Sequence, residues 1–140
     1  MVGTEPQIIE RYIKTGRARL VYRHLLQLGE GSRVLAEVAE CAGAQGKFWP
    51  MRELIYRRQD QVGDGTDPDG VLALVQAVGL DEPAYYQCMT DHRFRPQISN
   101  DYAASQREGI VNRPTMLVNG VPIVGDQPFA VFAKAIDAAH

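Results

Sequence analysis

The end of the chain, GIVNRPTMLVNGVPIVGDQPFAVFAKAIDAAH (residues 109–140), carries the clearest structural pattern in the sequence. Two β-prone runs, Thr115–Val118 and Val121–Val124, are separated by Asn119-Gly120, a pair that readily adopts the positive φ angles of a type I′ turn. After Pro128, apolar residues recur at helical spacing, namely Phe129, Phe132, Ala133 and Ile136. This stretch therefore predicts a β-hairpin followed by an amphipathic helix.

The composition indicates one ordinary globular domain. The chain has 140 residues, of which 45% are apolar and 23% charged, enough for a hydrophobic core. Its formal net charge of −2 argues against nucleic acid as a partner. No apolar run approaches the roughly 20 residues that span a bilayer, and the start, MVGTEPQIIERYIK, has no signal-peptide pattern. We therefore expect no membrane partner and no export directed by this sequence.

The first part of the chain predicts a helix and then a strand. In EPQIIERYIKTG (5–16) the apolar residues at helical spacing are Ile8, Ile9, Tyr12 and Ile13, and Gly16 is a good C-cap. Residues 18–24, ARLVYRH, are β-prone and lie between Gly16 and the turn-forming LGEGS. A helix followed by a strand fits a βαβ unit whose first strand is absent.

Four or five helices are expected between this strand and the hairpin. Their segments are SRVLAEVAECAGAQG, GKFWPMRELIYRRQ, TDPDGVLALVQAVGL, DEPAYYQCMTDHR and ISNDYAASQREGI. The expected caps and first-turn prolines are Ser32, Pro50, Thr66 or Asp67 with Pro68, Asp81 with Pro83, and Ser99 or Asn100. Gly79 and Gly109 are the expected ends of the third and last segments.

Two stretches, AECAGAQGKFWPMRELIY and PTMLVNGVPIVGDQPFAVFAKAI, resemble the DsbA family of thiol-disulfide oxidoreductases, and they occur in that family's order. The resemblance implies an α/β, thioredoxin-like fold of DsbA type. In that arrangement, residues 30–108 form a helical insertion between an incomplete N-terminal βαβ half and a C-terminal ββα half. Residues 1–140 would then form a single domain.

The resemblance also implies a substrate-binding site at Arg113, Pro114 and Thr115. In the family the proline of this turn is cis, and the backbone beside it pairs with a substrate polypeptide. The alternative is an ordinary trans proline that opens a strand. Arg113 departs from the small or β-branched residue usual in the family; its guanidinium would either favour a nearby thiolate or point into water.

The redox motif of the family is missing from the sequence. In relatives, Cys-x-x-Cys lies at the start of the first helix, where the helix end stabilises a thiolate, and this chain begins after that point. We expect Cys41 and Cys88 to be buried free thiols, neither catalytic nor joined to each other. Phe48 and Trp49 are expected in the core. The three histidines do not lie at zinc-ligand spacing from the cysteines, so neither metal nor cofactor is expected.

Three functions remain open. The first is a DsbA-like oxidoreductase family protein that is redox-inactive as given, and the second is a non-catalytic module that binds a polypeptide. A glutathione-dependent relative is a weaker third possibility, because its catalytic residue would also lie before this sequence. Family resemblance implies an extracytoplasmic location.

The missing first strand leads us to expect a homodimer. In the thioredoxin fold that strand lies between the strands expected at residues 18–24 and Thr115–Val118. Without it, those two strands would pair directly, or a strand from another chain would complete the sheet. The first helix would lose part of its packing surface, so its apolar face or the unpaired strand edges would bind a second copy.

Overall fold

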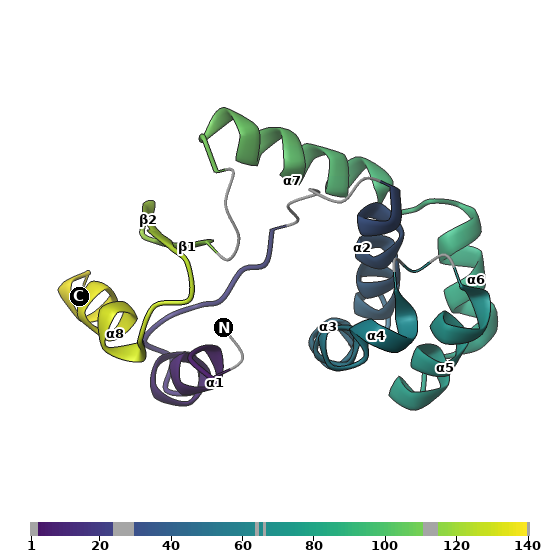
Figure 1. Ribbon diagram of the computed structural model, residues 1–140, viewed down its shortest axis with the longest axis horizontal. Helices are drawn as coiled ribbons and strands as arrows, with labels where there is room; N and C mark the ends of the chain where they lie inside the picture. Colours follow the sequence, from purple (N-terminus) through teal and green to yellow (C-terminus); the bar gives the residue numbers. More distant parts are fainter. Residues whose placement is uncertain (1–2, 24–29, 64, 66, 111–114, 140) are drawn as a thin grey trace. The chain divides into compact units, whose positions relative to one another are not determined.

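The computed structural model describes residues 3–23, 30–63, 65, 67–110 and 115–139. The chain divides into two compact units (Figure 1). The first, here called the hairpin unit, contains Met1–Tyr22 and Ser105–His140; the second, the helical unit, contains Arg23–Ala104. The sequence of the helical unit therefore interrupts that of the hairpin unit.

The hairpin unit begins with a helix, as the sequence predicts. Helix α1 (Glu5–Ile8) continues into a π-helical turn, η1 (Ile9–Ile13), where the Lys14 N–H donates to the Ile9 carbonyl at 2.9 Å. Gly16 then has a φ of +75°, a left-handed conformation that glycine adopts without strain. The predicted end of this helical segment is confirmed.

The predicted hairpin and final helix are also confirmed. Strands β1 (Thr115–Val118) and β2 (Val121–Val124) pair antiparallel across Asn119-Gly120. Both turn residues have positive φ, +49° for Asn119 and +85° for Gly120, as a type I′ turn requires. Helix α8 (Phe129–Ala138) begins directly after Pro128.

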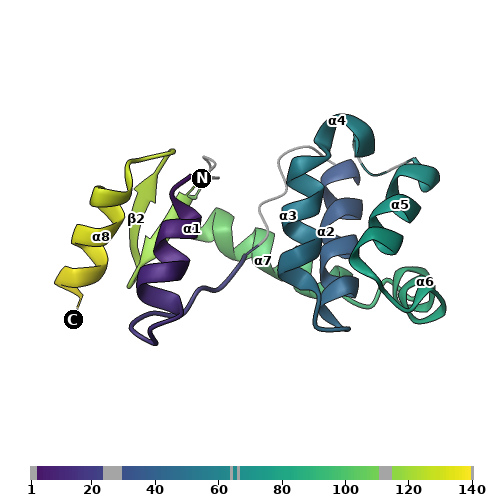
Figure 2. The same cartoon turned by 90° about the horizontal axis from the view of Figure 1, so that it is seen from below.

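Helix α1 lies beside α8, and both pack with the hairpin (Figure 2). The buried residues of this core are Ile8, Tyr12, Ile123, Phe132 and Ile136. Tyr12 is completely buried, and an Arg17–Asp137 ion pair of 3.1 Å joins the segment after η1 to α8. Of the apolar face predicted for the first helix, Ile8 and Tyr12 are therefore buried within the unit, and Ile9 and Ile13 are half-buried.

The prediction of a strand at residues 18–24 is wrong for residues 18–23, the part of this range that the structure describes. Residues 18–23 form no strand, and the sheet of the described residues contains only β1 and β2. The Ala18 N–H donates to the Tyr12 carbonyl at 3.0 Å, and Val21 is 63% exposed. A β-prone run forms a strand only where it can pair with a partner strand, and neither of the described strands pairs with these residues. His24 lies outside the described residues.

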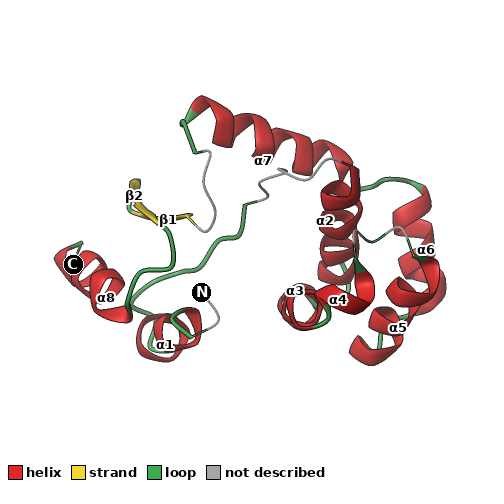
Figure 3. Cartoon of the chain, viewed as in Figure 1, coloured by secondary structure: helices red, strands yellow, loops and turns green. Residues whose placement is uncertain are grey.

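The helical unit consists of short helices (Figure 3). They are α2 (Glu30–Gly43), α3 (Phe48–Arg57), α4 (Gln59–Val62), α5 (Pro68–Val78), α6 (Glu82–Thr90) and most of α7 (Arg95–Arg107). Short α4 was not expected from the sequence. The remaining helices correspond to the five predicted segments.

Local capping signals explain two of these helix starts. Asp67 accepts a hydrogen bond from the Asp69 N–H at 3.2 Å, and Asp81 accepts one from the Ala84 N–H at 3.1 Å. The prediction of these caps is confirmed. The N-caps predicted for α2 and α7 are wrong, because α2 begins two residues before Ser32 and α7 begins at Arg95, before Ser99 and Asn100.

Helices α2, α3, α5 and α6 enclose the core of the helical unit. Its buried residues are Val38, Ala39, Cys41, Ala42, Met51, Ile55, Val62, Leu74, Val75, Leu80, Tyr85 and Cys88. Phe48 packs against this core, as predicted, but Trp49 is 40% exposed. The prediction that Trp49 is a core residue is wrong because Met51 and Ile55 define the buried face of α3, and Trp49 lies on another face.

Tyr85 makes the stability of the helical unit sensitive to alkaline pH. Burial raises the pKa of Tyr85 from 10.0 to about 12. An unfolded chain loses this proton at lower pH than the folded chain, so the stabilisation is complete below pH 10 and is lost as the pH rises toward 12.

We predict that Tyr85→Phe will reduce this alkaline loss of stability, whereas Tyr56→Phe on α3 will not, because Tyr56 is 46% exposed. Urea unfolding across this pH range can be followed by the fluorescence of Trp49, the only tryptophan. An identical pH dependence in the Tyr85→Phe variant would contradict the assignment.

Candidate functional site

The structure describes one of the three predicted substrate-binding residues. Thr115 is the first residue of β1; it is half-buried and lies opposite Val124 in the hairpin. Arg113 and Pro114 lie outside the described residues, as does the bond expected to be cis. Of the site predicted from the resemblance, the structure therefore describes only Thr115 and the strand that begins with it.

The register of the hairpin determines which backbone groups point outward. Val118 and Val121 flank the two-residue turn, so they form a hydrogen-bonded pair, and the next pair, Leu117 and Pro122, does not. Residues of a non-hydrogen-bonded pair direct their backbone groups away from the partner strand. The N–H and C=O of Leu117 therefore point toward the outer edge of β1.

The outer edge of β2 is a poor place for another strand to bind. Pro122 has no N–H to donate, a property that confines proline to edge strands. The Val124 carbonyl accepts a hydrogen bond from Gln127 Nε2 at 3.1 Å. By contrast, no strand of the described residues lies along the outer edge of β1. Pro122 was the signal in the sequence for this asymmetry, and the sequence analysis missed it.

One outer face of the hairpin also exposes apolar side chains. Leu117 is 39% exposed and Val124 is 48% exposed, whereas Ile123 on the opposite face is buried. The outer edge of β1 therefore combines backbone hydrogen-bonding groups with a nearby apolar surface. Such an edge can receive an extended polypeptide by strand addition.

The two cysteines form a disulfide, so the prediction of free thiols is wrong. The bond joins Cys41 on α2 to Cys88 on α6, with a Cα–Cα distance of 5.9 Å. The cysteines are 2% and 6% exposed. The prediction that both cysteines are buried is confirmed. In the sequence, this expected burial was the only indication that the two residues share one core. Because both sulfur atoms are bonded, neither residue supplies a thiolate.

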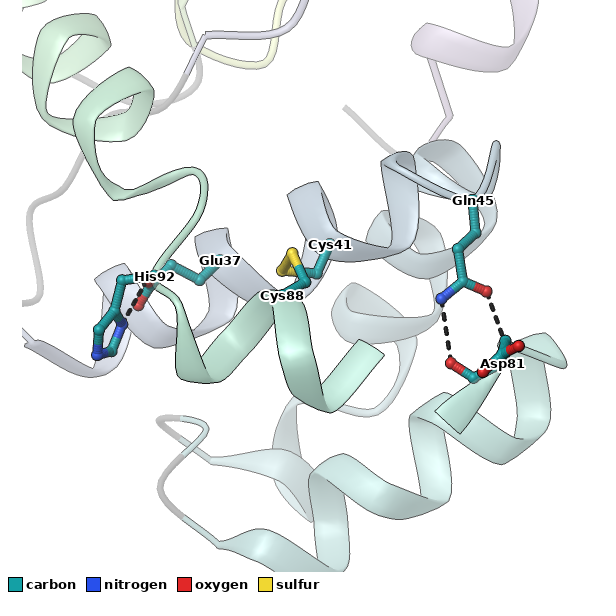
Figure 4. The surroundings of a disulfide bond; sticks show 6 residues. All are labelled: Glu37, Cys41, Gln45, Asp81, Cys88 and His92. Atoms are coloured by element: carbon teal, nitrogen blue, oxygen red, sulfur yellow. Dashed lines mark hydrogen bonds and ion pairs between the residues drawn. A yellow bond between two sulfur atoms is a disulfide. The ribbon is translucent and has the colours of Figure 1, made fainter. Parts of the chain in front are cut away.

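The disulfide is the middle contact of three that join α2 and the turn after it to the segment around α6 (Figure 4). Glu37 and Cys41 on α2, and Gln45 in that turn, are four positions apart. Gln45 accepts a hydrogen bond from the Asp81 N–H at 2.8 Å and donates to the Asp81 carbonyl at 3.1 Å. Spacing of four residues places Glu37 and Cys41 on one face of α2, and Gln45 lies two residues beyond the end of the helix.

Glu37 forms the third contact. Its side chain is 2% exposed; one carboxylate oxygen lies 3.0 Å from His92 Nδ1, and the other accepts a hydrogen bond from Arg95 at 3.3 Å. His92 has a φ of +48°, a conformation uncommon for residues other than glycine. The buried carboxylate therefore holds the turn between α6 and α7, a structural role that the sequence did not reveal.

Comparison with known proteins gives the family. A family model described as Thioredoxin matches residues 2–138. The chain belongs to the thioredoxin family. Members of this family are thioredoxin-like in fold, and in this chain the thioredoxin-like domain is mainly helical with a two-stranded sheet in the described residues. No solved structure matches the chain significantly.

Similar sequences occur within longer proteins named as antiporters. Na(+)/H(+) antiporter NhaA 3 of Salinispora tropica is 30% identical over 118 residues, 83% of this chain and 18% of that protein. NhaA 1 of Salinispora arenicola is 28% identical over 137 residues, 96% of this chain and 20% of that protein. NhaA of Herminiimonas arsenicoxydans is 23% identical over 122 residues, which are 87% of this chain and 19% of that protein. The chain spans about a fifth of the length of these relatives.

In the described part of this thioredoxin-family chain, none of the helices combines the length and the apolar character needed to cross a membrane. None of its His, Cys, Asp and Glu side chains come together in groups of three or more that could hold a metal ion.

We predict that removing the disulfide will destabilise the helical unit. The bond closes a loop with a sequence separation of 47, for which the chain-entropy model gives about 4 kcal/mol. A double variant, Cys41→Ala with Cys88→Ala, should lower the free energy of unfolding by up to about this amount. Urea unfolding followed by Trp49 fluorescence measures it. Dithiothreitol should lower the stability of the wild type and leave that of the double variant unchanged.

Proposed function

We propose that this thioredoxin-family chain is DsbA-like and that its 140 residues have no thiol-disulfide oxidoreductase activity. The order of the elements supports the DsbA-like subtype. The helical unit interrupts the hairpin unit between η1 and β1, the place where the DsbA family has its helical insertion. The residues corresponding to the first strand and Cys-x-x-Cys of that family are missing from the given sequence.

One observation carries the proposed lack of activity: both cysteines are in a buried disulfide. Reduction of a substrate disulfide begins with attack by a thiolate and ends when a second thiol releases the mixed disulfide. This chain has no free thiol for either step. Oxidation of a substrate dithiol would require its thiolate to reach Cys41 or Cys88, and burial of both sulfur atoms opposes that approach.

We predict that the protein will not accelerate the reduction of insulin by dithiothreitol. The double variant Cys41→Ala with Cys88→Ala should give the same background rate, because neither cysteine acts in exchange. Activity of the wild type above this background, lost in the double variant, would contradict the proposal.

The DNA upstream of the Met1 codon offers an independent test of the relation to the DsbA family. An in-frame sequence encoding an apolar strand followed by Cys-x-x-Cys would support DsbA-like descent and would assign redox chemistry to the longer protein. An in-frame stop codon would favour a non-catalytic module. The Cys41–Cys88 disulfide supports an extracytoplasmic location, because such bonds persist in oxidising compartments.

A second candidate function is binding of a polypeptide strand along the outer edge of β1. It is supported by the outward backbone groups of Leu117, the apolar surface of Leu117 and Val124, and the absence of a described strand along that edge. Main-chain hydrogen bonds would provide affinity, and the side chains beside them would provide specificity. Arg113, Pro114 and Thr115 would contact the same polypeptide at the start of the strand.

A second copy of this chain is the simplest donor of such a strand, so we also propose a homodimer. The route through the apolar face of the first helix is disfavoured, because Ile8 and Tyr12 are buried against α8 and the hairpin. The edge of β1 is the remaining route. Pairing of two β1 strands across a two-fold axis would satisfy the outward groups of both copies.

We predict that Leu117→Pro will abolish the dimer and that Leu117→Ala will largely preserve it. Both variants lose the leucine side chain, but only proline loses the outward N–H, and the hairpin ladder does not use that N–H. Sedimentation velocity at micromolar concentration measures the outcome, with circular dichroism as a check of folding. A monomeric wild type would refute the homodimer, and equal effects of the two variants would place the interface elsewhere.

A further inference from the structure

The hairpin offers one suitable edge to an incoming strand. The outer edge of β2 contains Pro122, which has no N–H, and the Val124 carbonyl, which accepts a hydrogen bond from Gln127 Nε2 at 3.1 Å. Strand β1 contains no proline, and no strand of the described residues lies along its outer edge. A polypeptide and a second copy of the chain would therefore use the same edge.

This edge is too short for two strands to share. Strand β1 has four residues, and only alternate residues, Thr115 and Leu117, direct their backbone groups outward. A strand that pairs with Leu117 also lies beside Thr115, two positions away. A second strand would need the same place, about 4.8 Å from β1. The edge thus receives one strand at a time.

The outer face of the hairpin contributes to both complexes. Leu117 is 39% exposed and Val124 is 48% exposed on this face. A two-fold axis perpendicular to the sheet keeps the outer faces of both copies on the same side, so the two Leu117 side chains approach each other. Dimerisation therefore covers part of the apolar surface that a bound polypeptide would contact.

We infer that the homodimer is an autoinhibited form, an inference that rests on the proposed binding of a strand at β1. Each copy occupies the edge of the other, so a polypeptide with an extended apolar segment binds only after the dimer dissociates. Because such a polypeptide binds the monomer alone, it shifts the equilibrium toward the monomer by mass action. The polypeptide site is therefore open at low protein concentration and closed at high protein concentration.

The probe is a fluorescein-labelled peptide with the sequence of residues 114–120, PTMLVNG. It copies β1, the strand that the edge receives in the proposed dimer. The control is the same peptide with N-methyl groups on its methionine and leucine. Adjacent residues of a strand direct their N–H groups to opposite edges, so the control peptide lacks an N–H on each edge and should not bind.

We expect the labelled peptide to sediment with the monomer, and excess unlabelled peptide to convert the dimer into monomer. At a protein concentration about 100-fold above the dimer dissociation constant, only roughly 7% of the chains are monomeric, so the apparent affinity for the peptide should weaken about ten-fold. Sedimentation velocity detected at the fluorescein absorbance measures the size of the complex, and fluorescence anisotropy measures the affinity.

Two variants of the full chain test the competition. Leu117→Lys keeps the outward N–H but brings two like charges together in the dimer. This variant should be monomeric, and its affinity for the peptide should not change with protein concentration. Val131→Lys is the matched control, because Val131 is 41% exposed, like Leu117, but lies on α8. It should keep the concentration dependence of the wild type.

Two results would overturn the inference and leave the proposed strand binding intact. They are a peptide that sediments with the dimer, and a dimerising wild type whose affinity for the peptide is the same at low and high protein concentration. Absence of peptide binding at every protein concentration would contradict the proposed strand binding itself. A wild type that is monomeric throughout would contradict the homodimer, and the inference fails with either.

Discussion

The helical unit depends on the covalent link between α2 and α6. Helix α6 has nine residues and α4 has four, and isolated helices of such length are unstable in water. The Cys41–Cys88 bond reduces the conformational entropy of the unfolded chain and holds α6 against α2. The Gln45–Asp81 hydrogen bonds and the Glu37–His92 contact lie on either side of the disulfide and set the position of α6 along α2. The core residues of the other helices then pack against this pair.

In the hairpin unit, the two-stranded sheet forms a core only together with helices. A hairpin alone is at best marginally stable, so its inner face requires helices to cover it. Tyr12 and Ile8 of the first helix, with Phe132 and Ile136 of α8, bury Ile123 of β2. This arrangement buries Ile8 and Tyr12 of the first helix without another copy of the chain. Among the described residues, the outer edge of β1 has no neighbouring strand, and such an edge can bind an extended polypeptide.

Membership of the thioredoxin family does not by itself provide redox chemistry. That chemistry requires an accessible thiolate, and here the cysteines stabilise the helical unit. The surface that we propose for binding uses another interaction, the backbone hydrogen-bonding groups at the outer edge of β1. Thus the family scaffold can present binding surfaces even where its reactive group is missing from the sequence.

Local sequence signals predicted the helices and the hairpin, because caps and tight turns depend on residues that are close together along the chain. Asn119-Gly120 determines the turn through the φ angles it tolerates, and Asp81 caps α6 through a hydrogen bond to a residue three positions away. Contacts between residues that are distant in the sequence could not be predicted from such local signals. Residues 18–23 have strand-like composition but no partner strand, and the disulfide requires Cys41 and Cys88 to be brought together by the packing of two helices. The sequence by itself therefore determined the hairpin turn and the N-caps of α5 and α6. The tertiary structure decided the strand pairing and the state of the cysteines, because both depend on which distant segments meet.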